Sequence, residues 1–501
     1  MQRRDFLKLA AASAASSLLP AAWAGAAADE WQAAFHAALR EKPWLLGWLG
    51  VSQPLLKTSA LEITGDWPRE LAGSFFRNGP ARHEIGGMRY RHWFDPDGMV
   101  HHYAIEPGRI SHQGRLVATQ KLEAEQAGDP LRQSFGTAPP GAPPIASPDS
   151  VNVANISVLS HAGRLFALWE GGSPYELDPR SLETRGPVAW SPETQGLPFT
   201  AHPRRDVDGT LWAFGYALSA GVLVIYQIDA AGKLVRAQPL SLGTVPMVHD
   251  FLITERQLVF VLPPYVAELG SAPTLAESYE WNGQEPARVL LVDKASLAIR
   301  RTLELPAHFT FHYGNAWEEA DGTVHFDHVR YPDAAVVSEM FRWIQRGEWR
   351  GRFGSLQRVT IPPSGAIREE PVLDGAIQAE FPQIDRRRTG RHSRKLTLLL
   401  RDERAAVARH PYLDSLAWVD LESGKLERYA FAPDLLPEEH LFVPHGESED
   451  EGWLLGTCLD FRRGVTQLNV FDAARIAEGP RAIARLPYAL PLGFHGTFVP
   501  A

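Results

Sequence analysis

Four of the 18 histidines stand out because apolar, small or aromatic residues surround them. They lie in the runs Thr200-Ala-His202-Pro203, Met247-Val-His249-Asp-Phe251, Phe311-His312-Tyr-Gly314 and Phe494-His495-Gly-Thr497. Burying an imidazole in such surroundings costs free energy unless both ring nitrogens find partners. A metal ion on one nitrogen and a hydrogen-bond acceptor on the other meet that need. We therefore take these four histidines as candidate metal ligands.

The spacing of the four histidines excludes a single local metal motif. Even the nearest pair, His202 and His249, is 47 residues apart. In a radial array of four-stranded sheets of roughly 40–50 residues each, such separations would place every histidine on a different sheet near one axis. An isolated histidine in an apolar strand is also a common satisfied core residue, so spacing alone leaves both interpretations open.

The rest of the chain favours an all-β array. From about Leu61 onward, short strand-like runs alternate with turn residues, for example Leu211–Tyr216, Val222–Ile228 and Gln257–Leu262. The 42 glycines and 39 prolines suit a structure with many turns. Helical patterns are few, the best being Asp29–Val51 and Ala334–Arg346, so a parallel α/β sheet is disfavoured. We predict one domain over residues 61–501, preceded by an N-terminal helical segment over 28–60.

Seven ordered segments resemble the signatures of the carotenoid cleavage oxygenase family. They are Gly73–Pro80, His92–His101, Ala201–Pro203, Met247–Phe251, Phe311–Glu318, Glu380–Asp385 and Phe494–Phe498. Pro96 stands where the family usually has glycine, but proline still suits the turn Asp95-Pro-Asp-Gly98. The resemblance implies a seven-bladed β-propeller with a helical and loop dome over the active-site face, and one non-haem Fe²⁺ per chain.

Matched motif by motif, the resemblance implies that the iron ligands are His202, His249, His312 and His495. It also implies that glutamates accept hydrogen bonds from three of these imidazoles, and the matching positions are Glu170, Glu380 and Glu439. His308 lies four residues before His312 and could mimic a zinc-binding pair, but only His312 stands at the ligand position of the motif. We expect His308 to be structural.

The reaction implied by the resemblance is cleavage of a carbon–carbon double bond by O₂, giving two carbonyl products. The expected substrate is a carotenoid or apocarotenoid, an apolar conjugated small molecule; its contact residues are not predicted. A stilbene-type alkene is the alternative within the family. Met99 stands where a tyrosine would recognise a phenol, which argues against it, while Lys121 could match the expected lysine.

A hypothesis from another class is a calcium-dependent, lactonase-like or ligand-binding propeller without iron. Such a protein would need clustered Asp and Asn ligands and would have no reason for four buried histidines with glutamate partners.

Charge and cysteine content exclude further classes. A net charge of −9 without a long Lys/Arg run removes the electrostatic footprint of nucleic-acid binding. The single cysteine, Cys458, allows no internal disulfide and no cysteine-rich zinc site.

The N-terminus is typical of a bacterial export signal. Arg3-Arg4-Asp-Phe6-Leu-Lys8 followed by a mildly apolar, alanine-rich stretch predicts a twin-arginine signal peptide over residues 1–27 and a periplasmic protein. No other stretch is long and apolar enough to span a membrane. The apolar residues 44–49 predict either packing on the main domain or peripheral membrane contact. We expect a monomer.

Overall fold

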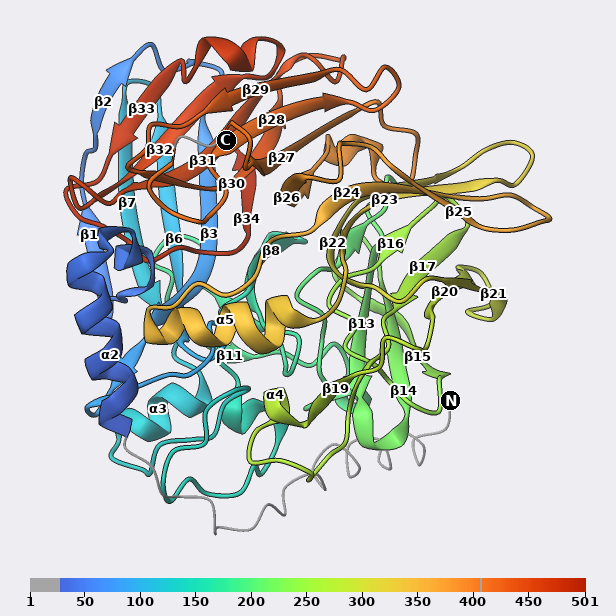
Figure 1. Ribbon diagram of the computed structural model, residues 1–501, viewed down its shortest axis with the longest axis horizontal. Coiled ribbons are helices and arrows are strands. Elements are labelled where there is room, and N and C mark those ends of the chain that lie inside the picture. Colours follow the sequence, from blue (N-terminus) through green and yellow to red (C-terminus); the bar gives the residue numbers. More distant parts are fainter. Residues whose placement is uncertain (1–27, 406–407) are drawn as a thin grey trace.

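The computed structural model describes residues 28–405 and 408–501, so the predicted signal peptide lies outside the described residues. Within these ranges, seven large antiparallel sheets surround a common axis as the blades of a β-propeller, which confirms the predicted fold class (Figure 1). The inner strands contact one another in turn: β16 with β22, β22 with β26, β26 with β30, β30 with β34, and β34 with β8. These inner strands therefore line the axis toward which the predicted ligands should converge.

Blades 1 to 4 are built from the following strands. Blade 1 contains β1 (Leu55–Thr58), β7 (Arg109–Leu116), β6 (Asp97–Glu106), β3 (Gly73–Arg82) and β34 (Gly496–Pro500). Blade 2 contains β8 (Ser157–His161), β9 (Arg164–Leu168), β10 (Tyr175–Leu177) and β11 (Thr184–Pro187). Blade 3 contains β12 (Arg204–Arg205), β13 (Leu211–Ala217), β14 (Val222–Ile228) and β15 (Leu234–Ser241). Blade 4 contains β16 (Leu252–Ile253), β17 (Gln257–Leu262), β20 (Ala287–Asp293) and β21 (Ile299–Leu305).

Blades 5 to 7 complete the ring. Blade 5 contains β22 (Phe309–Glu318), β23 (Val324–Tyr331), β24 (Ser355–Ile361) and β25 (Arg368–Pro371). Blade 6 contains β26 (Ile377–Gln383), β27 (Lys395–Asp402), β28 (Ser415–Asp420) and β29 (Leu426–Ala430). Blade 7 contains β30 (Leu435–Pro444), β31 (Gly452–Asp460), β32 (Val465–Asp472), β33 (Ala482–Arg485) and β2 (Glu62–Gly65).

Strands from the two ends of the sequence close the ring. The late strand β34 pairs with β3 at the inner edge of blade 1, with Phe75 opposite Phe498. The early strand β2 pairs with β33 at the outer edge of blade 7. Each of blades 1 and 7 therefore combines strands from both ends of the sequence, which closes the ring.

Neighbouring blades pack through apolar side chains that alternate along their strands. Between blades 4 and 5, for example, Val259, Leu291, Phe326 and Val359 belong to one buried cluster. Alternation along a strand buries both faces of each sheet when a blade lies on either side. The packed blades form a rigid frame for the axis.

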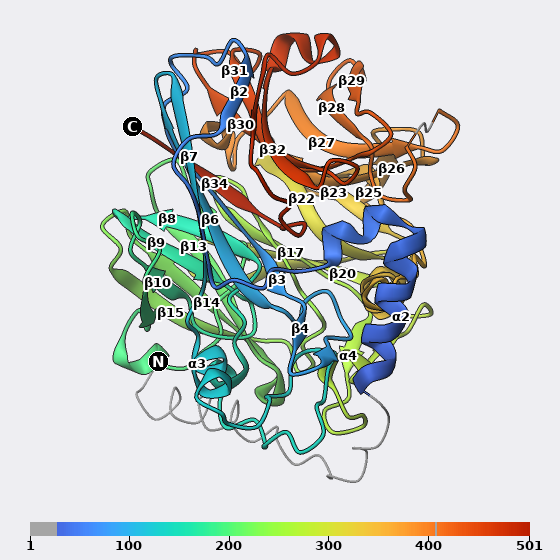
Figure 2. The same ribbon diagram turned by 90° about the vertical axis from the view of Figure 1, so that its left-hand side faces the viewer.

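Helices and two small sheets cover the blades. The helical elements are α2 (Ala28–Glu41), η2 (Pro43–Trp48), α3 (Gln120–Gln126), η3 (Pro148–Val151), η4 (Pro192–Thr194), η5 (Leu218–Ala220), α4 (Leu275–Ser278), η6 (Val336–Met340), α5 (Phe341–Trp343), η7 (Ile344–Arg346), η8 (Arg386–Arg388) and η9 (Ala473–Glu478). The small sheets pair β4 (Glu84–Ile85) with β5 (Met88–Arg89), and β18 (Tyr265–Ala267) with β19 (Tyr279–Trp281). α2 packs against η7 and α4 against η6, so these helices meet beside the propeller (Figure 2).

The N-terminal helical segment is anchored by aromatic packing. In α2, Trp31 and Phe35 are one turn apart and both buried, and the Trp31 ring stacks on Trp343 with centroids 5.7 Å apart. The following η2 buries Trp44, Leu45 and Trp48 in the main core. Of the two interpretations of residues 44–49, packing is therefore the one that the structure favours. These three buried side chains are not available to a bilayer, and only Leu46 and Leu49 remain partly accessible.

In the part of the chain that the structure describes, no helix has the length and apolar character needed to cross a bilayer.

Candidate metal centre

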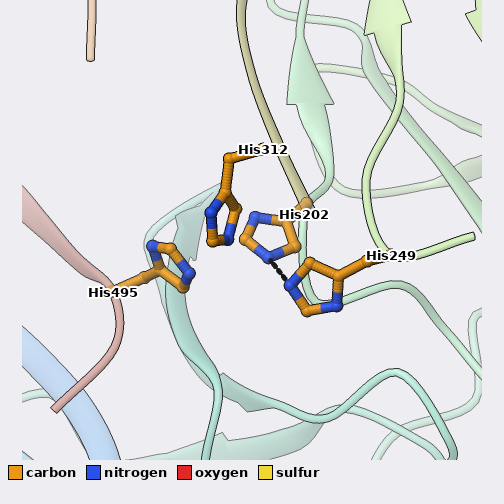
Figure 3. A group of neighbouring side chains, drawn as sticks. All are labelled: His202, His249, His312 and His495. Carbon is orange, nitrogen blue, oxygen red and sulfur yellow. Dashed lines mark hydrogen bonds between the residues drawn. The ribbon is translucent and has the colours of Figure 1, made fainter. Parts of the chain in front are cut away.

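The four histidines predicted from the sequence meet at the propeller axis (Figure 3). His202 lies two residues before the inner strand β12 and His249 three residues before β16. His312 lies in β22, and His495 immediately precedes β34. One ring nitrogen of each lies within 4.8 Å of the others, and the Nε2 atoms of His202 and His249 are 2.9 Å apart. Each histidine comes from a different blade, so the propeller itself assembles the cluster.

Three of the imidazoles have a glutamate at their other nitrogen. His312 Nδ1 donates to Glu380 at 2.6 Å, and His495 Nδ1 donates to Glu439 at 2.8 Å. His249 Nδ1 lies 2.7 Å from a carboxylate oxygen of Glu170. The sequence predicted these three glutamates as partners of three imidazoles without pairing each with a particular histidine, and the contacts orient the Nε2 atoms toward the centre.

His202 has no such glutamate among the described residues. Its backbone N–H donates to Thr200 Oγ1 at 3.0 Å, which fixes the turn that leads into β12.

Local irregularities in the inner strands aim the functional side chains. The pairing register shifts on both sides of Tyr313 in β22, between Glu380 and Gln383 in β26, and between Pro437 and His440 in β30. His312, Glu380 and Glu439 lie at these bulges. A bulge bends a strand and turns a side chain out of the regular alternation, which is how bulges serve functional sites.

Phe381 holds one of these irregularities in place. Its φ of 57° lies in the left-handed region, which is costly for a non-glycine residue. Its backbone N–H donates to the Glu380 carboxylate at 2.5 Å, and its ring stacks on His312 with centroids 5.6 Å apart. The strained backbone therefore supports both Glu380 and His312.

The donor set fits a metal ion. Because Nδ1 of His312 and His495 donates to a carboxylate, the Nε2 atoms present lone pairs to the centre, and His312 Nε2 is buried without a partner. Burial lowers the pKa of His495 to about 4 and holds the pKa of His202 well below its ordinary value, aided by the neighbouring imidazoles. Neutral imidazoles whose lone pairs converge on one point are ligands for a transition-metal cation.

The carboxylates stay ionised despite burial. Burial opposes the charged form of Glu380 and Glu439, but His312 and His495 outweigh it, so the pKa of each carboxyl lies below its ordinary value. Burial likewise opposes protonation of His312, yet the adjacent Glu380 raises the pKa of this imidazole. The Glu380 and Glu439 carboxylates thus place negative charge just outside the four imidazoles, where it offsets the charge of a bound cation.

An apolar cavity adjoins the histidines. A small cavity of about 20 Å³ is lined by His249, His312 and His495 together with aromatic residues, among them Trp93, Phe311 and Phe494. A larger cavity of about 600 Å³ is lined by Trp169, Met247, Tyr279 and other mainly apolar residues. Phe94 and Ile156 line both, so they separate the two spaces.

Sequence reasoning missed several residues that support the glutamates. Tyr331 Oη donates to Glu380 at 2.7 Å, and Gln383 Nε2 donates to Glu439 at 2.9 Å. Arg77 lies 3.9 Å from the Glu439 carboxylate and donates to Glu438 at 3.2 Å. Arg77 and Gln383 both lie inside recognised motifs, which indicated their importance but not their roles, whereas Tyr331 lies in none of them.

Lys121 is not a substrate contact in this structure, which corrects the idea that it could serve as the lysine of a phenol-binding site. Its Nζ is fully buried and donates to Tyr90 Oη at 2.7 Å, Asp97 Oδ1 at 3.0 Å and Glu125 Oε2 at 3.1 Å. A buried ammonium is stable only when carboxylates compensate it, so it stays with them. Neither Lys121 nor Met99 lines either cavity.

Comparisons with known proteins agree with this fold and site. The model of the family described as retinal pigment epithelial membrane protein matches residues 52–500. The apocarotenoid-15,15'-oxygenase of Synechocystis is 31% identical over 473 residues, covering 87% of this chain and 92% of the relative. The resveratrol cleavage oxygenase 1 of Aspergillus fumigatus is 27% identical, covering 88% and 92% respectively. A cobalt-substituted structure of the Synechocystis apocarotenoid oxygenase superposes with a TM-score of 0.80 at 28% identity, covering 92% of this chain and 98% of that one.

The fold and the axial histidine site define a β-propeller oxygenase. The chain belongs to the carotenoid cleavage oxygenase family, as its sequence motifs indicated, and is an enzyme of the alkene-cleaving oxygenase class.

Proposed function

We propose that this protein cleaves a C=C double bond of a carotenoid or apocarotenoid with O₂, at a non-haem Fe²⁺ held by His202, His249, His312 and His495. The observation that carries the proposal is the convergence of four imidazoles beside an aromatic cavity that adjoins a much larger apolar one. The Synechocystis relative named as an apocarotenoid oxygenase supports the substrate class.

Bound Fe²⁺ would supply the binding and activation of O₂, and the chain's residues would do the rest. Glu170, Glu380 and Glu439 hold three imidazoles by their Nδ1 atoms, so that the rings stay aimed at the centre. The large apolar cavity excludes water from a conjugated chain and leads it toward Phe94 and Ile156. No side-chain acid or base is required at the double bond, and the protein's task is to position the alkene.

Metal analysis read together with oxygen uptake tests the proposal. Protein matured in a bacterial host should contain iron and consume O₂ with an apocarotenal, giving two carbonyl products. The double variant with His249→Ala and His312→Ala should lose both the iron and the activity. Retained activity in that variant, or stoichiometric calcium with no iron, would refute the proposal.

Stilbene cleavage remains the second candidate, supported by the relative named resveratrol cleavage oxygenase. The burial of Lys121 among carboxylates disfavours it, because a phenol would lack that partner in the cavity. Oxygen uptake with a hydroxystilbene, measured beside the apocarotenal, decides between the two.

The calcium-dependent propeller has little support from the site. Calcium prefers six to eight oxygen ligands, whereas the axial donors are four imidazole nitrogens.

We further propose that the chain is exported to the periplasm by the twin-arginine route and acts as a monomer. Arg3 and Arg4 before Phe6-Leu-Lys8 support export, and Arg3→Lys with Arg4→Lys should retain the protein in the cytoplasm on fractionation. Light scattering should give the mass of one chain, and a mass of two chains or more would refute the monomer. Peripheral membrane contact through residues 44–49 would rest on Leu46 and Leu49, and unchanged liposome flotation after replacing both with Ser would refute it.

A further inference from the structure

A second group of potential metal ligands lies away from the axial histidines. His308, in the connection from β21 to β22, meets His328 of β23 and Glu369 of β25, and one ligand atom of each lies within 4.8 Å of the others. His308 and His328 are fully buried, and the Glu369 side chain is 14% exposed. The group therefore joins the connection between blades 4 and 5 to two strands of blade 5.

The hydrogen bond of His308 leaves one lone pair without a partner. Its Nδ1 faces the carbonyl oxygen of Pro306 at 2.9 Å. A carbonyl only accepts, so Nδ1 must carry the proton. The buried Nε2 has no partner, and burial lowers the pKa of this imidazole to about 3, so the ring is neutral. His308 thus presents an unused acceptor to the interior.

His328 contacts Thr310 and Glu369 through its two ring nitrogens. The Thr310 hydroxyl donates its only proton to the Val329 carbonyl, so its oxygen accepts from His328 Nδ1 at 3.3 Å. His328 Nε2 faces a Glu369 oxygen at 2.8 Å. A carboxylate oxygen only accepts, so a proton or a metal ion must hold these two atoms together.

We propose that His308, His328 and Glu369 form a second metal site, which binds one divalent transition-metal ion such as Zn²⁺. Two imidazole nitrogens and a carboxylate oxygen are donors that suit this ion. A shared proton would satisfy His328 and Glu369 but would leave His308 Nε2 unpartnered, whereas a metal ion satisfies all three. Arg330 lies 3.2 Å from the other Glu369 oxygen and orients the carboxylate.

The consequence of this second site is mechanical. A metal ion there would fasten the β21–β22 connection to β23 and β25. His308 immediately precedes β22, and His312 lies in that strand four residues later. The ion would therefore also fix the position of the strand that carries one axial ligand. His308 is then structural, as expected from the sequence, but as a ligand of its own site.

Zinc titration of the metal-free full-length chain tests the proposal by stoichiometry. The wild-type chain should bind two Zn²⁺, and the double variant with His308→Asn and Glu369→Gln should bind one. The axial double variant with His249→Ala and His312→Ala should also bind one, and this remaining ion should disappear when Glu369→Gln and His308→Asn are added. A single Zn²⁺ in the wild type that the axial variant abolishes would overturn the proposal, as would two Zn²⁺ in the His308→Asn, Glu369→Gln variant.

A matched control and a milder variant exclude misfolding as the explanation. His325 on the same strand β23 also pairs with a glutamate, Glu319, at 3.1 Å, but lies outside the cluster. His325→Asn with Glu319→Gln should keep two Zn²⁺. Glu369→Gln alone preserves the shape of the side chain and should weaken binding to the second site at least tenfold. Co²⁺ absorption bands in the axial variant should fade with this single change, and bands that persist unchanged would overturn the proposal.

Discussion

Replacing Glu380 by glutamine isolates what its charge does for the axial site. The carboxylate accepts from His312 Nδ1 at 2.6 Å, from Tyr331 Oη at 2.7 Å and from the backbone N–H of Phe381 at 2.5 Å. In Glu380→Gln, the amide oxygen can still accept from His312 and Phe381, and the amide nitrogen can donate to the Tyr331 oxygen. The shape and the hydrogen bonds remain, and only the negative charge is lost.

The expected magnitude follows from the strength of charged hydrogen bonds. A hydrogen bond to a charged group contributes about 1.5–3 kcal/mol and a neutral one about 0.5–1.5 kcal/mol. Losing the charge should therefore cost the metal-bound state about 1–1.5 kcal/mol, which is about a tenfold weaker metal affinity. This agrees with the range of about 10–100-fold found when partners of ligating histidines are changed.

Competition with a chelator under anaerobic conditions measures the change in Fe²⁺ affinity. Tyr331→Phe is the matched control, because it removes one neutral donor from the same carboxylate and leaves its charge. It should weaken the metal affinity less than about threefold, since the lost hydroxyl donates to the carboxylate and not to the imidazole, and the His312 bond to a charged acceptor is kept. If Glu380→Gln folds normally and binds Fe²⁺ within about twofold of the wild type, the reasoning about the carboxylate is wrong.

Three further predictions concern packing, substrate access and pH. Trp48→Ala should cost about 3–5 kcal/mol of unfolding free energy in urea denaturation, because a fully buried indole is removed from the core. Phe94→Trp should raise the KM for a long substrate with unchanged metal content, since Phe94 stands between the two cavities. Burial lowers the pKa of His83, His92 and His101 to about 3, so the unfolded chain binds more protons and stability falls as pH drops below 6.5. Lowering the pH from 7.5 to 5.5 should therefore reduce the free energy of unfolding by about 1.4 kcal/mol for each of these three histidines. A free energy of unfolding that stays constant over this range would contradict the prediction.

The sequence made the fold class and the ligand set predictable because both depend on residue types in ordered motifs. Short strands between turns predicted the all-β array, and four histidines in apolar runs predicted ligands that the structure brings together. Their glutamate partners were also found, since each stands in a recognisable run.

What could not be predicted depends on distant contacts. The bulges that aim His312, Glu380 and Glu439 arise from pairing between strands, and no local residue pattern announces them. The contact of Tyr331 with Glu380 joins residues 49 positions apart through the fold. Lys121 was a possible match to the lysine of a phenol-binding site, yet its contacts with the buried carboxylates of Asp97 and Glu125 decide its role. Residues 44–49 left two interpretations open until burial of Trp44, Leu45 and Trp48 favoured packing.

The position of β34 near the end of the chain also determines when the last axial ligand becomes available during synthesis. His495 immediately precedes that strand, whereas the other three axial ligands lie at positions 202, 249 and 312. At about 5–20 residues per second, a ribosome needs roughly 15–60 s to reach His495 after making His202. A nascent chain therefore carries only three of the four imidazoles until blade 1 can receive its last strand. Coordination of an axial metal ion by all four imidazoles therefore requires that synthesis has passed His495 and that β34 has paired with β3.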